Sequence, residues 1–159
     1  MTPASASTPD RSWRGITRLA IITDVRAGLK DAALTDNFCL RIKRVAERNA
    51  PLPIECVDFG DAALKAGDAV VLIAQAAVQE MGSARALVFT VRKDKEGGLD
   101  PQPVLMGSAP RAVTLTGSAA DEGALERALS DSLSEVLPWL RPSDTDDLIP
   151  TTLRERKIG

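Results

Sequence analysis

The chain contains no histidine, and this absence restricts its chemistry more than any other feature of its 159 residues. Imidazole is the usual general base beside a nucleophilic Ser or Cys, so Ser-His and Cys-His catalytic pairs are excluded. The His ligands of zinc and haem sites are excluded as well. Two cysteines are too few for a four-thiolate metal site. The sequence therefore favours a protein that is not an enzyme, and it implies no cofactor.

Aromatic residues are also scarce, with three Phe, two Trp and no Tyr. Proteins that bind single-stranded nucleic acid stack the bases on aromatic side chains, and this chain has few to offer. Its net charge of −2 gives no general attraction to polyanions. We therefore expect no nucleic-acid partner and a core built from aliphatic side chains and Ala.

Long apolar runs are missing, and no stretch reaches the length needed to cross a bilayer. We therefore expect no transmembrane segment. The N-terminal stretch has neither the basic region nor the apolar region of a signal peptide. Two interpretations remain open: the chain is cytoplasmic, or a leader preceded Thr2 and Met1 was added during expression.

What the chain does contain is typical of one soluble domain. Hydrophobic residues make up 44% and charged residues 26% of the sequence, which is ordinary for a globular protein. The length fits a single α+β domain at residues 13–141. We expect the Ser/Thr/Pro-rich residues 1–12 to be a disordered tail and residues 142–159 to be a flexible C-terminal tail.

The two most strand-like runs are residues 69–79 and 85–92. In both runs apolar side chains alternate with polar or smaller ones, which is the period of a strand with one buried face. The link at residues 80–84 is short and contains Gly82, as a hairpin connection should. The pattern therefore predicts an antiparallel hairpin near the middle of the sheet.

The rest of the chain supplies two helices and further strands. The predicted elements are a strand at 16–25, a helix from Thr35 or Asp36 to about Asn49, a strand at 54–59, the hairpin, short strands at 104–106 and 111–116 that could be one bent edge strand, and a helix at 119–137 with Ser118 and Asp121 as a capping box. The order is β-α-β-β-β-β-α. Each helix has one apolar face, so we expect a two-layer α+β sandwich: a mixed or antiparallel sheet of four to five strands with both helices on one face.

This element order and the polar leading tail are similar in topology to the small α+β domains of bacterial envelope lipoproteins, such as the TolB N-terminal type. The resemblance implies a module that works in the bacterial cell envelope.

The two cysteines are candidates for a disulfide. Cys39 lies at the border of the first helix's apolar stripe, and Cys56 lies in the strand that follows. A crossover helix packs on the sheet to which it returns, so the two side chains could meet. A disulfide would stabilise the fold by roughly 3 kcal/mol and would imply an oxidising compartment. The alternative is a pair of buried, reduced cysteines that act as small apolar side chains.

Three carboxylates follow the ends of the first two strands. Asp24 ends the first strand, and Asp58 and Asp61 follow the second. If those strands are parallel, the three side chains lie near one edge of the sheet and could hold Mg²⁺ or Ca²⁺. The alternative, which we favour, is that they only form turns.

Arg41, Arg44 and Arg48 lie together on one flank of the first helix. Such a row could bind a phosphate or an acidic partner. The alternative is a solvated face, or pairing with the acidic second helix.

The sequence therefore favours a non-catalytic accessory or protein-binding module, periplasmic or exported. Two alternatives are a small cytoplasmic enzyme with a metal held by Asp24, Asp58 and Asp61, and a cytoplasmic adaptor that docks through residues 142–159. A homodimer is also conceivable, because Val71, Ile73 and Val88 lie on the side of the sheet that the helices do not cover.

Overall fold

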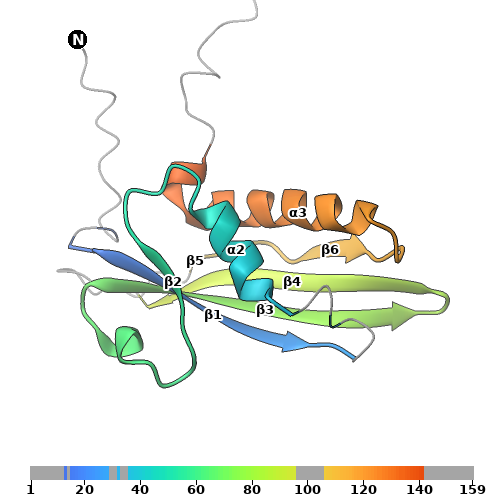
Figure 1. Cartoon of the computed structure of the whole chain (residues 1–159), viewed down its shortest axis with the longest axis horizontal. Helices are drawn as coiled ribbons and strands as arrows, with labels where there is room; N and C mark the ends of the chain where they lie inside the picture. Colours follow the sequence, from blue (N-terminus) through green and yellow to red (C-terminus); the bar gives the residue numbers. More distant parts are fainter. Residues whose placement is uncertain (1–12, 14, 29–31, 33–35, 96–105, 142–159) are drawn as a thin grey trace, which may run out of the picture.

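Both long helices lie on the same face of one mixed sheet in the computed structural model (Figure 1). The structure describes residues 13, 15–28, 32, 36–95 and 106–141. The predicted tails at 1–12 and 142–159 lie outside the described residues, as do residues 96–105 between the hairpin and the last strands. None of the helices in the described part combines the length and the apolar content that crossing a bilayer requires.

The described residues form six strand segments, two helices and two short 3₁₀ turns. The segments are β1 (Arg18–Arg26), α2 (Phe38–Ala46), β2 (Ile54–Cys56), η4 (Ala62–Lys65), β3 (Ala69–Met81), β4 (Ala84–Lys95), β5 (Met106–Gly107), β6 (Arg111–Thr114), α3 (Ala120–Val136) and η5 (Pro138–Leu140). This is the predicted two-layer α+β sandwich.

The sheet is parallel on one side and antiparallel on the other. Its order is β2-β1-β3-β4-β5, with β6 also paired to β4. β1 runs parallel to both β2 and β3, so β1-α2-β2 is a parallel crossover. β5 and β6 pair with different stretches of β4, so six segments occupy five positions. β5 and β6 are the two halves of one interrupted edge strand. Pro110 lies between them, at an edge position where proline is tolerated.

The hairpin strands β3 and β4 are longer than the sequence pattern indicates. Met81 pairs with Ala84, so the turn consists of Gly82 and Ser83 alone rather than residues 80–84. Gly82 has φ 63°, a conformation that such two-residue turns need and that glycine adopts without strain. The polar residues near the turn gave the sequence pattern of a loop. They belong to the end of the hairpin that extends beyond β1, where the strands bury no apolar face.

The main core lies between the sheet and the helices. Alternate residues of each strand point toward α2 and α3, and the aromatic rings of Phe38 and Phe89 meet edge to face at 6.2 Å. The fully buried side chains of this core include Leu19, Ile21, Phe38, Ile42, Leu72, Leu87, Phe89, Leu125, Leu129 and Leu133. The apolar stripes predicted for both helices are therefore the faces that pack.

The first helix is shorter than the predicted span of residues 36–49. Its N-cap is Asn37, in the left-handed region at φ 63°, with no side-chain cap; Asp36 does not cap it, and Thr35 lies outside the described residues. At the other end, Trp139 Nε1 donates to the carbonyl oxygen of Ala46 at 2.7 Å. Trp13 packs edge-on against Trp139 with ring centroids 5.2 Å apart. The indole thus satisfies one of the carbonyls that a helix end leaves unpaired.

The start of α3 uses Asp121 in a different way from the predicted capping box. Its carboxylate does not reach back to Ser118; it accepts from the N–H groups of Thr116 and Gly117, both at 3.0 Å, and from the Thr116 hydroxyl at 2.6 Å. The Ser118 hydroxyl accepts from Ala120 N at 3.3 Å. Asp121 therefore holds the turn between β6 and α3 rather than the first turn of the helix alone.

We expect Asp121→Asn to lower the melting temperature at neutral pH, by an amount that shrinks in acid. The pKa of Asp121 lies below its ordinary value of 3.8, chiefly because the Thr116 hydroxyl donates to the carboxylate. A pKa that is lowered by folding stabilises the protein fully above the ordinary value, and this stabilisation is lost as the pH falls through the folded pKa. Thermal unfolding from neutral pH to about pH 2 tests this. Asp131→Asn, an exposed position on the same helix, is the matched control; an equal, pH-independent difference for both variants would contradict the assignment.

Candidate protein-binding surface

The two cysteines join the first turn of α2 to the edge strand β2. Their Sγ atoms lie 2.07 Å apart, at disulfide distance, and their Cα atoms 6.1 Å apart. Cys56 is exposed and Cys39 is half-buried, so the link lies near the surface, at the boundary between the helix layer and the sheet. The proximity expected from the crossover geometry is confirmed, and neither side chain is a free thiol in this structure.

The three aspartates at the strand ends are not assembled into a metal site. Asp61 accepts from Ala63 N at 2.8 Å and caps η4, which is the turn role that we favoured. Asp24 lies on β1 opposite Gln75 of β3, and Asp58 follows β2 in an exposed turn. In the described ranges, no three acidic or Cys side chains are grouped so that they could hold a metal ion.

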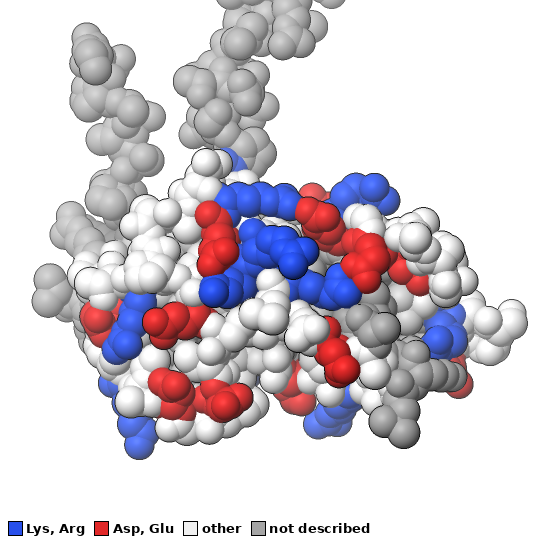
Figure 2. Space-filling view, viewed as in Figure 1, with Lys and Arg blue, Asp and Glu red and all other residues white. Residues whose placement is uncertain are grey.

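The arginine row on α2 is largely taken up by α3. Arg41 Nη2 donates to Glu122 at 2.8 Å, and Arg48 pairs with Glu126. Donation from Arg41 lowers the pKa of Glu122. Figure 2 shows Lys and Arg side chains gathered over α2, with Asp and Glu side chains around them. Pairing between the helices, rather than a free anion site, therefore accounts for Arg41 and Arg48, and such exposed pairs contribute about 0–1 kcal/mol each.

The opposite face of the sheet is covered at one end only. Ala20, Ile22, Val71 and Ile73 form a second, smaller core there, under Ala63 of η4 and the half-buried Val57 and Leu64. Val71 and Ile73 are thus buried under the chain's own segment 57–68. Of the three apolar residues that could have formed a dimer interface, only Val88 remains accessible.

The rest of that face carries no covering element within the described part of the chain, and we call it the open face. It holds a shallow hollow of about 380 Å³. Ala77 lies opposite Val88, and Gln75 lies opposite Thr90. The side chains on the floor of the hollow are therefore small to medium in size and mostly uncharged. The side chains that point to the open face are Asp24, Arg26, Gln75, Ala77, Gln79, Val88 and Thr90.

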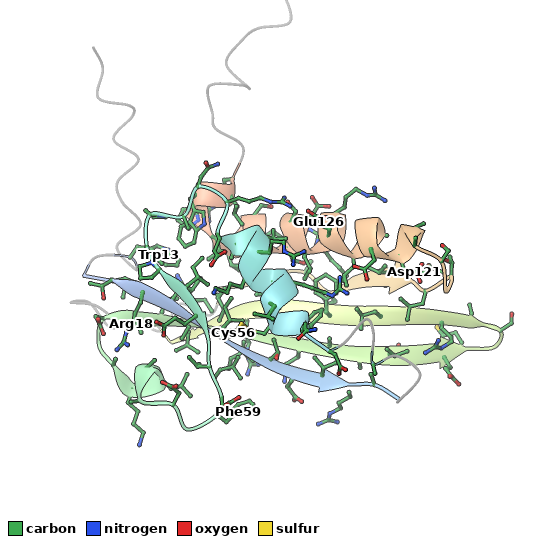
Figure 3. The ribbon with its side chains drawn as sticks, in the orientation of Figure 1. Trp13, Arg18, Cys56, Phe59, Asp121 and Glu126 are labelled. Atoms are coloured by element: carbon green, nitrogen blue, oxygen red, sulfur yellow. A yellow bond between two sulfur atoms is a disulfide. The ribbon has the colours of Figure 1, made fainter. Side chains whose placement is uncertain are left out.

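Two large apolar side chains stand at the ends of the open face. Phe59 and Met81 are each 69% exposed. Phe59 belongs to the segment that covers the small core, and Figure 3 places it on the side of the sheet away from the helices. Met81 has the same parity on β3 as Gln75 and Ala77, next to the hairpin turn. A face with an exposed aromatic and an exposed methionine at its ends has the composition of a protein interface.

A scan against protein-family models finds none that matches the chain, and a search of the curated proteins finds no match.

Sequence reasoning brought the two cysteines together and found the alternation of the hairpin, but it did not find Phe59 as part of a surface. The sequence predicted Phe59 at the end of a strand at 54–59, but β2 ends at Cys56 and Phe59 lies in the exposed turn that follows. A turn says nothing about which face of the sheet it will lie against. Gly60, at φ 99°, lies in this turn. The direction in which the chain leaves β2 depends on the packing of Val57 and Leu64.

Proposed function

We propose that this chain is a non-catalytic module that binds another protein through its open face and that it works in an oxidising compartment such as the bacterial periplasm. The single observation that carries the binding role is the open face itself. One end of the sheet face is covered by segment 57–68. The rest, which no other described segment covers, carries small apolar and uncharged polar side chains together with Asp24 and Arg26.

The composition of the open face supports a protein rather than a small-molecule ligand. The hollow is shallow and its floor is the flat surface of β3 and β4, whereas small ligands are usually held in enclosed clefts. Phe59 and Met81 are residue types enriched in interfaces, and they can anchor a partner by burying apolar area. Gln75, Gln79 and Thr90 can exchange hydrogen bonds with its backbone.

The Cys39–Cys56 pair supports the compartment. Disulfides persist in secreted and periplasmic proteins and are rare in the reducing cytosol. The resemblance in topology to small envelope lipoprotein domains points the same way. A metal-dependent enzyme is the weaker alternative, because Asp24, Asp58 and Asp61 do not form a ligand set. The adaptor alternative depends on residues 142–159, which lie outside the described residues.

Site-specific photo-crosslinking in the producing cells tests the binding role. A photo-reactive residue in place of Gln79, which is exposed on the open face, should give one discrete adduct. The same residue in place of Glu47, which is exposed beyond the end of α2, is the control and should give none. An adduct with twice the mass of the chain would identify the partner as a second copy. No adduct at position 79, or equal adducts at both positions, would overturn the proposal.

A further inference from the structure

The outer edge of β6 has unpaired backbone groups, and their direction follows from the hydrogen bonds of its neighbour. Leu115 N donates to Arg85 O at 2.8 Å, and Ser108 N donates to Val91 O at 2.7 Å. Odd-numbered residues of β4 therefore direct their backbone groups toward this edge. Since Leu87 pairs with Val113 and Phe89 with Arg111, it is Arg111 and Val113 that bond to β4.

Ala112 and Thr114 consequently point their N–H and C=O groups away from the sheet. Within the described ranges no strand pairs with this side of β6, and both residues are exposed. An edge of this kind is a template for an additional strand.

A groove runs beside this edge, between β6 and α3. It has a volume of about 360 Å³. Ala124 and Ala128 of α3 form part of its wall, and their short side chains leave room that larger residues would fill. The residues around the groove are Arg111, Ala112, Val113, Thr114, Ala124, Arg127, Ala128 and Asp131.

Two charges on the groove side of α3 differ from the other charges of that helix. Glu122, Glu126 and Glu135 are paired with Arg41, Arg48 and Arg111 respectively. Arg127 and Asp131 are exposed, and neither is ion-paired to another residue that the structure describes.

The spacing of Arg127 and Asp131 matches that of an extended strand. The two residues are about 6 Å apart along the helix axis, and alternate residues of an extended strand are about 6.6 Å apart. A strand lying in the groove can therefore place an acidic residue at Arg127 and a basic residue two positions away at Asp131. Because α3 returns from the turn at 116–119 antiparallel to β6, an incoming strand antiparallel to β6 meets Arg127 first.

We propose that the groove between β6 and α3 binds an extended segment of another protein, which adds to β6 as an antiparallel strand. The segment carries an acidic residue and, two positions toward its C-terminus, a basic one. Backbone bonds to Ala112 and Thr114 supply affinity, and the two side-chain charges supply direction. The site adjoins the open face, because Ala112 pairs with Val88, but the proposal does not depend on the open face.

A peptide titration of the full chain tests the inference. The probe is the blocked peptide Thr-Val-Glu-Val-Lys-Val-Thr, and the matched control exchanges its Glu and Lys. On the ¹⁵N-labelled chain, the probe should slow amide exchange at Ala112 and Thr114, and it should bind about tenfold more tightly than the control, as two exposed charge pairs allow.

Two variants separate this site from a structural effect. Ala112→Pro removes one outward N–H at an edge where proline is tolerated, so it should fold normally and bind the probe about tenfold more weakly, as the loss of one hydrogen bond allows. The double variant Arg127→Glu/Asp131→Lys should prefer the control peptide. Glu47→Gln, at an exposed position beyond the end of α2, should leave probe binding unchanged.

Four results would overturn the proposal. They are no binding of either peptide, binding that leaves the Ala112 and Thr114 amides unperturbed, no change of preference in the charge-exchanged variant, and loss of amide protection at 112 and 114 when the peptide-free chain is truncated after Arg141. The last result would mean that the chain's own C-terminal residues occupy the groove.

Discussion

Phe89→Ala should lower the free energy of unfolding by about 3–5 kcal/mol, the largest effect that we expect from any single substitution in this chain. The ring is 1% exposed and lies on the helix face of β4, where it meets Phe38 edge to face. Removing it leaves a cavity between the sheet and α2 that the surrounding strands cannot close without moving. Urea denaturation followed by far-UV circular dichroism measures the loss.

Val88→Ala is the matched control, because Val88 is the preceding residue of the same strand and points to the open face. It is half-buried, so its truncation should cost about 1 kcal/mol or less. The contrast between adjacent positions tests which face holds the core. Equal losses at positions 88 and 89 would mean that the open face is covered in solution.

The double variant Cys39→Ser/Cys56→Ser should be less stable than the wild type by about 3 kcal/mol, the second largest effect. The cysteines are 17 positions apart, and cross-linking a loop of that size removes conformations mainly from the unfolded chain. Dithiothreitol should lower the melting temperature of the wild type and leave that of the double variant unchanged. A wild type that is insensitive to the reductant would contradict the assignment.

Alkylation at lysis extends this experiment to the compartment. Protein taken directly from the producing cells should show no thiol that reacts before reduction and two that react afterwards. Two reactive thiols in the untreated protein would remove the support for an oxidising compartment, even if the isolated chain forms the disulfide in air.

The fold could be predicted from the sequence where one periodicity extends over many residues. The alternation in β3 and β4 and the stripe of Leu125, Leu129 and Leu133 in α3 each repeat often enough to identify the element and its buried face. The length of the β1–β2 connection then allowed a parallel crossover, which in turn brought Cys39 and Cys56 together.

Features that depend on tertiary packing could not be predicted in this way. Val71 and Val88 have the same apolar character, yet the first is covered by segment 57–68 and the second is accessible. Asp121 matches a capping box by its distance from Ser118. In the structure, its carboxylate instead accepts hydrogen bonds from the Thr116 and Gly117 amides. The local sequence shows which side chains need a partner, and the tertiary structure determines which partner each one has.

The contact between Trp13 and Trp139 has a consequence for how the molecule can be held. The first and last described parts of the chain meet at one end of the domain, and Figure 1 places the hairpin turn at the opposite end. Tethers attached at residue 13 and at residue 141 would therefore hold the same end of the domain and leave Met81 at the far end. Immobilisation through either of these two positions should accordingly give equivalent orientations on a sensor surface.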